Sequence, residues 1–263
     1  MSVLKVRPPL SFQGRQRLLA RRLRHLASGA LRQIRTSLRD YRRYLRDLDV
    51  YYRSAGAEPV ETLDLQPRTG DRIEFTPFDA HYLYQDLWAF KRVLRSGAQA
   101  HVDVGSRLDF VAFLSAVTQV TFIDIRPPRL EIENFESRKG DILHLPYADR
   151  SIQSLSCLHV AEHIGLGRYG DAIDPEGTKK AMRELERVLA PGGNLYFSLP
   201  VGRPRLCFNA HRIHSPAQIV AGFAGLRLLE FSGVDDEKRF RERRPLEELE
   251  GSRYACGMFW FTR

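Results

Sequence analysis

Short apolar segments alternate with segments of helix length from residue 100 to the last residues of the chain. The apolar segments predict seven strands, at residues 100–105, 119–125, 139–146, 151–160, 194–202, 226–234 and 254–262. Helices are predicted at residues 108–117, 175–193 and 215–225. Strands joined through helices form a mostly parallel sheet with helices on both faces, so the chain is expected to be an α/β protein. No helix-length pattern separates the last two strands, which predicts an antiparallel strand at the C-terminal edge of the sheet.

The N-terminal region differs from this pattern in its charge. Residues 1–53 contain 14 arginines and lysines against three aspartates, a net charge of +11, whereas the whole chain carries +9. The rest of the chain is therefore close to neutral. Between residues 27 and 48, apolar residues recur at alternating steps of four and three, which predicts an amphipathic helix with arginines on its other faces. We divide the chain into a basic helical arm with a linker, residues 1–58, and an α/β domain, residues 59–263.

Three roles for this arm agree with its composition. Its apolar seam can dock on the domain or on a second copy of the chain, which would give a homodimer. A basic amphipathic helix also suits an anionic membrane surface. Nucleic acid is the least favoured partner, because the positive charge is confined to the arm.

The cysteines and the hydropathy indicate the compartment. Cys157, Cys207 and Cys256 are far apart in the sequence and form no CxxC pair, so neither a disulfide framework nor a zinc cluster is expected. No other ligand spacing predicts a metal. The longest uncharged apolar stretch, residues 110–123, is shorter than a membrane span, and the basic N-terminus lacks an apolar signal core. We expect a cytoplasmic protein, peripheral at the inner face of the membrane if the arm binds lipid.

Polar residues follow the predicted strands at the edge where a parallel sheet binds ligands. Asp124 ends the second strand, 19 residues after Gly105. In parallel sheets that bind nucleotides, an acidic side chain at this distance accepts hydrogen bonds from the two hydroxyls of the ribose. At the third strand, Asp141 suits an adenine amino group and Ile142 an apolar ring face. The predicted cofactor-binding residues are Asp103, Gly105, Ser106, Arg107, Asp124, Ile125, Asp141, Ile142 and His159. Carboxylates at the ends of three successive strands predict a nucleoside site.

Several stretches of the domain resemble known families. Similarity to class I S-adenosylmethionine-dependent methyltransferases is found in VDVGSR, FIDIR, GDILHLPYADRSIQSLSCLHVAEHI and ELERVLAPGGNLYFSLP. HVAEHIGLGRYGDAIDPEG and PVGRPRLCFNAHRIHS resemble more specifically the family called domain of unknown function 268, whose bacterial members are often associated with surface-polysaccharide biosynthesis. Together the resemblances cover about residues 75–262. They imply a Rossmann-like fold, S-adenosyl-L-methionine as cofactor, and a sugar or glycan as methyl acceptor.

The loop after the first strand differs from the pattern of class I S-adenosylmethionine-dependent methyltransferases. In that pattern three glycines stand at alternate positions. Here these positions hold Gly105, Arg107 and Asp109, so only the first glycine remains. The missing glycines normally let the backbone approach the amino-acid end of the cofactor. Two hypotheses follow. Either Arg107 points outward or pairs with the methionine carboxylate and binding survives, or its side chain fills the cleft and the protein is a scaffold that has lost its cofactor.

A hydroxyl acceptor requires a base, and histidine titrates near neutral pH. The predicted catalytic residues are His163, His211 and His214, which follow the fourth and fifth strands. His163 has a second interpretation, because Glu162 and His163 form a pair that often caps a helix or packs beneath the cofactor in the resembling methyltransferases. Substrate binding is predicted for Arg168, Tyr169, Asp171, Asn209 and Arg212.

Three functions are therefore open at the level of the sequence. The first is S-adenosylmethionine-dependent O-methylation of a sugar in surface-polysaccharide biosynthesis. The second is a non-catalytic, methyltransferase-like scaffold of a glycan assembly complex. The third is an RNA methyltransferase whose arm binds phosphates, which the near-neutral charge of the domain opposes.

Overall fold

A computed structural model describes residues 37–263, which divide into two compact units. The first unit ends at Pro77 and the second spans Phe78–Arg263. The sequence placed the boundary after residue 58, whereas the second compact unit begins at Phe78. The first half of the predicted arm helix, up to residue 36, lies outside the described residues.

The described part of the first unit contains a helix over residues 37–52 and a short 3-10 helix, η1 (Thr62–Asp64). The side chain of Arg43 donates to the carbonyl of Thr69 at 3.4 Å, and the Tyr52 hydroxyl donates to the carbonyl of Val60 at 2.8 Å. These two contacts tie the segment after the helix back to it. Leu38, Tyr41 and Leu45 of the apolar seam are exposed.

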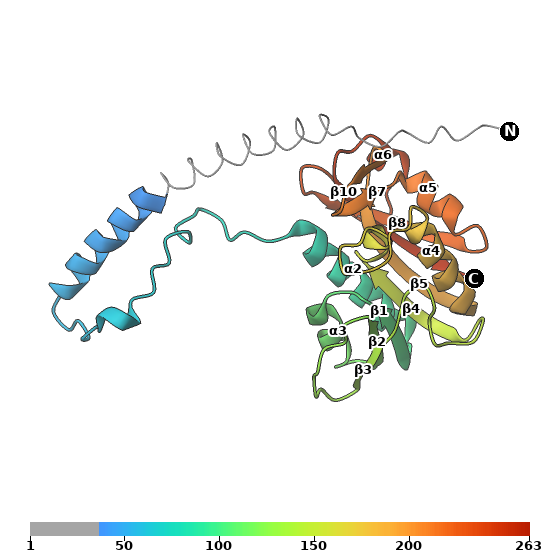
Figure 1. Cartoon of the computed structure of the whole chain (residues 1–263), viewed down its shortest axis with the longest axis horizontal. Coiled ribbons are helices and arrows are strands. Elements are labelled where there is room, and N and C mark those ends of the chain that lie inside the picture. The colour runs from blue at the N-terminus through green and yellow to red at the C-terminus, as the bar shows by residue number, and fades with distance from the viewer. Residues whose placement is uncertain (1–36) are drawn as a thin grey trace. The chain divides into compact units, whose positions relative to one another are not determined.

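The second unit is built on an eight-stranded sheet with the order β3-β2-β1-β4-β5-β10-β8-β9 (Figure 1). Its strands are β1 (Ala100–Val104), β2 (Gln119–Asp124), β3 (Phe135–Lys139), β4 (Ile152–Leu158), β5 (Leu189–Val201), β8 (Arg227–Val234), β9 (Phe240–Arg241) and β10 (Ala255–Thr262). The strands from β3 to β5 are parallel, and β10 is antiparallel to both of its neighbours. A separate hairpin pairs β6 (Arg205–Cys207) with β7 (His211–Ile213). The predicted Rossmann-like class is confirmed, and the order of the strands reverses between β1 and β4, where such sheets bind ligands.

Three details of the predicted sheet are wrong. The sheet has eight strands and not seven, because β9 was not predicted. The third strand ends at Lys139, and the segment expected as a strand at 139–146 is a turn in which Asp141 accepts the N–H groups of Leu143 and His144. The C-terminal strand β10 is not at the edge but lies between β5 and β8. Its residues are buried along most of their length, which suits an interior position, and the two-residue β9 forms the edge instead.

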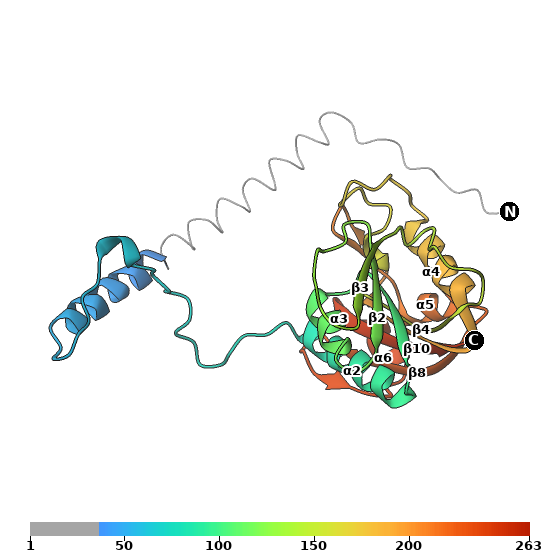
Figure 2. The ribbon, with the colours of Figure 1, turned by 90° about the horizontal axis from the view of Figure 1, so that it is seen from below.

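Helices cover both faces of the sheet (Figure 2). On one face lie α2 (Ala80–Ser96) and α3 (Leu108–Leu114), and on the other lie α4 (Gly177–Val188) and α5 (Pro216–Gly222). The fifth helix of this unit, α6 (Glu247–Glu250), is a single short turn beside α5. The start of α2 is fixed because the Asp79 carboxylate accepts the N–H groups of His81 and Tyr82. This cap places the aromatic first turn of α2 beside the ends of the strands.

A buried polar cluster holds α2 against the sheet. The Trp88 indole donates to the Glu230 carboxylate at 3.0 Å, and the Arg92 guanidinium pairs with the same carboxylate. All three side chains are almost fully buried, so loss of one partner would leave a buried charge or donor unsatisfied. Within residues 37–263, no helix has the length and apolar composition that a bilayer crossing requires.

Candidate active site

The turn after β1 is organised by a buried carboxylate. Asp103 accepts the N–H of Ser106 at 3.0 Å and its hydroxyl at 2.6 Å, and the Ser156 hydroxyl of β4 also donates to it. The Ser106 oxygen in turn accepts the N–H of Leu158 at 3.0 Å. Burial raises the pKa of Asp103 to about 7, against these hydrogen bonds, which lower it. The cluster ties the ends of β1 and β4 together.

Gly105 is required at the top of this turn. Its φ of +70° lies in the left-handed region, which costs little for glycine and is strained for other residues. A Cβ at this position would also lie 3.1 Å from the Val160 side chain. The glycine therefore allows the backbone to pass close to the segment that follows β4.

A cavity of about 440 Å³, called here the first cavity, opens at this end of the sheet. Its lining combines residues that follow β1, β2, β3 and β4. Six of the predicted cofactor-binding residues line it: Gly105, Asp124, Ile125, Asp141, Ile142 and His159. The structure thus brings together side chains that the sequence distributes over more than 50 positions, from Gly105 to His159.

The carboxylate of Asp124 has one oxygen held and one available. Its Oδ1 accepts the N–H of Arg126 at 2.6 Å, which orients the side chain. Its Oδ2 faces Gly105, 3.7 Å from the position that a Cβ would occupy there. Asp141 is similarly oriented, because its Oδ1 accepts the N–H of Leu143 at 2.9 Å. An oriented carboxylate with a free oxygen at the end of β2 can accept hydrogen bonds from the hydroxyls of a ribose.

Three predicted cofactor-binding residues do not line the first cavity. Asp103 and Ser106 are buried beneath it, because their polar groups are used within the turn. Arg107 points elsewhere: its guanidinium pairs with Asp109 at 2.6 Å and lies over the Tyr82 ring, 5.0 Å from the centroid. Arg107 therefore does not fill the cavity, although it replaces a glycine of the broad methyltransferase pattern.

The loop after β4 forms a wall of the first cavity through Ile164–Asp174. The Asp171 carboxylate accepts the N–H groups of Gly165, Leu166 and Tyr169 at 2.7, 3.1 and 3.2 Å, and these bonds lower its pKa. Desolvation acts against them as the largest single contribution to that pKa. The Arg212 guanidinium donates to the carbonyls of Ile164 and Asp174 at 2.5 and 2.8 Å. Asp171 and Arg212 thus shape the loop. The substrate-binding role of Arg212 stays a prediction.

Tyr169 is the exposed tip of this wall. Arg126 and Arg168 both lie over its ring, with their guanidinium carbons 4.6 and 5.0 Å from the centroid. The stacking connects the segment after β2 with the loop after β4 across the first cavity. Arg168 also donates to the carbonyl of Ala210 at 3.1 Å.

A second cavity, of about 800 Å³, lies on the other side of His159. Its wall comes from the first turn of α2, the β6–β7 hairpin, the segment after β8 and the residues before β10. The lining includes Phe78, His81, Tyr82, His211 and Tyr254 together with both acidic and basic side chains. Because His159 lines both cavities, it marks the place where they approach each other.

The three predicted catalytic histidines have different surroundings. His211 lines the second cavity, and desolvation, with Arg168 and Arg205 nearby, lowers its pKa. His163 lines the first cavity; its Nδ1 donates to the carbonyl of Ala210 at 2.6 Å, and burial lowers its pKa to about 4. His214 lines neither cavity, because it pairs through its backbone with Val201 and Gly202 at the base of the hairpin. Of these three histidines, only His211 lines the second cavity.

The remaining predicted residues lie at the margins. Glu162 is fully buried with no hydrogen-bond partner for either oxygen, and burial raises its pKa to about 8. It lines neither cavity. Asn209 is exposed in the hairpin loop and lines neither cavity.

Sequence reasoning missed His81, Tyr254 and Cys256 as site residues. The only signal in the sequence is the density of aromatic side chains at residues 76–95, of which some can line a pocket and others can fill the core. The structure divides them in this way: Phe78 and Tyr82 line the second cavity, whereas Trp88 is buried in the core. No sequence pattern placed β10 beside the first turn of α2.

A comparison with sequence families identifies the family of this chain. The sequence family described as "Caenorhabditis protein of unknown function, DUF268" matches residues 109–250. The chain belongs to this family. A search of curated proteins gives no match.

Solved structures with a similar fold have low sequence identity to this member of the family. The N-methyltransferase NodS from Bradyrhizobium japonicum WM9, in complex with S-adenosyl-L-homocysteine, has a TM-score of 0.49 at 17% identity, covering 68% of this chain and 85% of that one. The [4+2]-cyclase SpnF has a TM-score of 0.49 at 14% identity, with 72% and 86% covered. YcgJ from Bacillus subtilis has a TM-score of 0.47 at 14% identity, with 67% and 99% covered.

Proposed function

We propose that this chain is an S-adenosylmethionine-dependent methyltransferase that methylates a sugar hydroxyl in surface-polysaccharide biosynthesis. The observation that carries the proposal is the first cavity at the point where the strand order reverses, with the oriented Asp124 carboxylate at the end of β2. The second cavity meets it at His159 and provides space for an acceptor. The sequence resemblance to methyltransferases and to the polysaccharide-associated family supports the choice of reaction and acceptor class.

The residues of the first cavity fit the parts of this cofactor. Asp124 would accept the two ribose hydroxyls, while Asp141 and the apolar side chains of Ile125 and Ile142 would hold the adenine. Gly105 leaves room for the amino-acid end, and Arg107 is turned away from it. When bound, S-adenosylmethionine supplies an electrophilic methyl group on a sulfonium. The chain's part is to orient both reactants and to exclude water, because alignment contributes most of the acceleration in an in-line displacement.

The second cavity suits a polar acceptor with apolar faces. The rings of Tyr82 and Tyr254 can pack against the C–H faces of a sugar, and Asp235 and Asp236 can accept hydrogen bonds from its hydroxyls. His211 remains neutral at pH 7 because its pKa is lowered from 6.5, so its ring can take up the hydroxyl proton. A glycan carried on lipid would bring this acceptor to an anionic membrane surface, which is the partner we propose for the basic arm. This places the protein peripherally at the inner face of the membrane.

Cofactor binding is tested by calorimetry of the full-length chain with S-adenosylhomocysteine. We expect one site per chain in the wild type and at least about 100-fold weaker binding in Asp124→Asn, because a charged acceptor of two hydroxyl bonds is lost. Asp109→Asn is the matched control, since Asp109 pairs with Arg107 outside the first cavity and its loss should leave binding unchanged. Absence of heat from the wild type at high ligand concentration would contradict the proposal and favour the scaffold.

The acceptor class is tested by methyl release from labelled S-adenosylmethionine. Nucleotide sugars, lipid-linked glycans and RNA are offered separately to the wild type and to Asp124→Asn. Product on a sugar acceptor that disappears with Asp124→Asn supports the proposal. Product on RNA alone would replace the sugar by RNA as the acceptor.

A further inference from the structure

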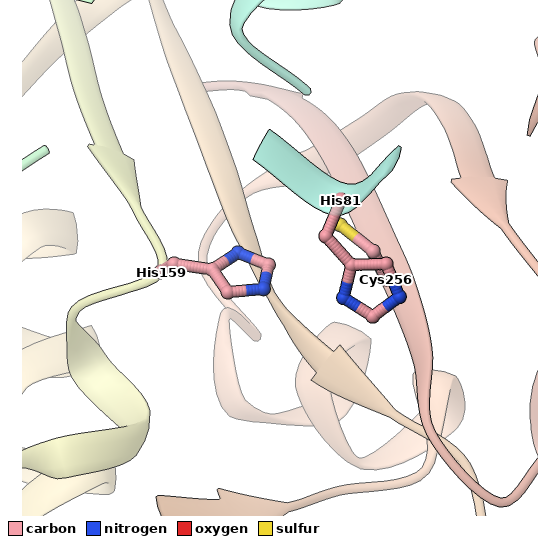
Figure 3. A group of neighbouring side chains, drawn as sticks. All are labelled: His81, His159 and Cys256. Atoms are coloured by element: carbon pink, nitrogen blue, oxygen red, sulfur yellow. The ribbon is translucent and has the colours of Figure 1, made fainter. Parts of the chain in front are cut away.

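Three side chains of the kinds that bind metals lie close together at the wall of the second cavity. One donor atom from each of His81, His159 and Cys256 lies within 4.8 Å of the other two. Figure 3 shows the three side chains converging from the first turn of α2, the end of β4 and the start of β10. The first and the last of them, His81 and Cys256, are 175 positions apart in the sequence. No short sequence motif therefore contains all three.

The hydrogen bonds around His159 fix which ring nitrogen carries the proton. The Ser198 hydroxyl donates its single hydrogen to Gln85 Oε1 at 2.5 Å, and the Gln85 amide nitrogen donates to Asp86 at 3.1 Å. The Ser198 oxygen therefore accepts from Nδ1–H of His159, which lies 3.4 Å away. The lone pair is left on Nε2, the tautomer that a metal-binding histidine with such a partner adopts.

The Nε2 atom of His159 is a buried hydrogen-bond acceptor, and no donor lies within reach of it. His159 is 8% exposed, and Nε2 has no hydrogen-bond partner. Leaving a buried polar atom without a partner costs free energy, and most such atoms in native proteins are paired. The same nitrogen belongs to the ring whose centroid lies 5.7 Å from that of His81. A cation between the rings would satisfy this lone pair.

The other two side chains are also held in place. The His81 ring stacks on the Tyr254 ring, with 5.1 Å between their centroids. Cys256 is fully buried in β10, which lies between β5 and β8.

We propose that His81, His159 and Cys256 bind a divalent metal of borderline softness, with zinc as the expected ion. Two imidazoles and a thiolate are zinc ligands, and tetrahedral coordination requires donor atoms about 3.3–3.6 Å apart, so side-chain movements of about an ångström close the site. On binding, Cys256 loses its thiol proton to solvent, and both imidazoles stay neutral. His81 and His159 line the second cavity whereas Cys256 does not, so the fourth coordination position opens toward that cavity.

The proposal is tested with cobalt(II) as a spectroscopic probe of the full-length chain, stripped with a chelator. We expect one equivalent to bind and to give a thiolate-to-cobalt charge-transfer band in the near ultraviolet, together with visible bands of a tetrahedral site. Zinc added in excess should remove these bands. A wild-type protein with no charge-transfer band would overturn the proposal.

Variants separate this site from the other cysteines. Cys256→Ala should abolish the charge-transfer band, whereas Cys157→Ala, also fully buried but in β4, should retain it. Ser198→Ala should weaken cobalt binding about 10–100-fold, because the partner that fixes the His159 tautomer is lost. If Cys256→Ala keeps the band and Cys157→Ala loses it, the assignment is wrong. Circular dichroism of each variant confirms that it is folded.

The metal site does not depend on the proposed methyl transfer. Its readout is the absorption of the cobalt-loaded protein in the absence of cofactor and acceptor. A protein that binds cobalt but no S-adenosylhomocysteine would keep the metal site and contradict the transferase, and the reverse result would do the opposite.

Discussion

The two cavities on either side of His159 are built in different ways. The first cavity takes its lining from segments that each directly follow one strand of the parallel sheet, from β1 to β4. The second combines the first turn of α2 with the hairpin of β6 and β7 and the segments before β9 and β10. The first contains the carboxylates that follow β2 and β3, Asp124 and Asp141, while aromatic and histidine rings make up a larger part of the lining of the second.

The difference suggests a division of labour. The geometry of the first cavity follows from the parallel sheet itself, because the carboxyl ends of neighbouring strands must meet at one edge. It therefore suits a constant ligand such as a cofactor. The second depends on connections particular to this chain, which suits a specific acceptor.

The largest effect that separates the two cavities is expected at His211. His211→Gln should lower kcat for methyl transfer about 100- to 10,000-fold, because a general base is lost, and should change the affinity for S-adenosylhomocysteine by less than about 2-fold. The wild-type rate should rise with pH through a pKa below 6.5, since burial and the neighbouring arginines lower it, and the variant should lack this rise. Steady-state kinetics across pH, with calorimetry, measure both. A large loss of cofactor affinity would show that the cavities are not separate in function.

A second effect concerns the free energy of unfolding, which should depend on pH through the buried Asp103 below the first cavity. Burial raises the pKa of Asp103 to about 7 in the folded protein, from an ordinary value of 3.8. Its contribution to the free energy of unfolding is therefore complete below about pH 4 and is lost as the pH rises through about 7. The total change is on the order of a few kcal/mol, at about 1.4 kcal/mol per pKa unit.

Asp103→Asn should remove that contribution. Urea unfolding at several pH values should show the wild type losing stability relative to the variant between about pH 4 and 7. Parallel curves for the two proteins would mean that Asp103 titrates normally and that its environment is wetter than its burial indicates.

A smaller effect is expected at the wall of the first cavity. Arg212→Ala removes the donors to the carbonyls of Ile164 and Asp174 and should weaken S-adenosylhomocysteine binding about 10-fold. Hydrogen exchange should become faster in residues 164–174 and stay unchanged in α2, which contributes to the second cavity. Arg212→Lys should restore part of the affinity. Unchanged exchange in the wall would place Arg212 in direct ligand contact instead.

The smallest effect is expected at Arg107. Its partner Asp109 and its own side chain are both well exposed, so their ion pair contributes less than about 1 kcal/mol. Arg107→Ala should therefore change the affinity for S-adenosylhomocysteine by less than about 2-fold, measured by calorimetry. A loss of tenfold or more would mean that the guanidinium turns inward to the carboxylate of the bound ligand.

The sequence was most informative where contacts follow one strand at a time. The apolar segments predicted β1, β2, β4, β8 and β10 to within about two residues at either end, and the spacing from Gly105 to Asp124 placed both residues in the first cavity. The prediction was weaker at the third strand, because the apolar residues of 142–145 are buried in a turn while β3 itself is mostly polar and exposed. Asp103 and Ser106 were correctly placed at the end of β1, but the sequence did not show that they bond to each other.

The sequence by itself determined the α/β alternation, the charge of the arm and the order of the residues along the first cavity, because these depend on periodicity and on local turns. Only the tertiary structure decided that Arg107 turns outward, that Arg212 holds the wall, and that His81, His159 and Cys256 meet. The two histidines and the cysteine meet because β10 enters the sheet between β5 and β8 and α2 packs on one face of that sheet. Both are contacts between distant parts of the chain, and their strength comes from burial that no local pattern records.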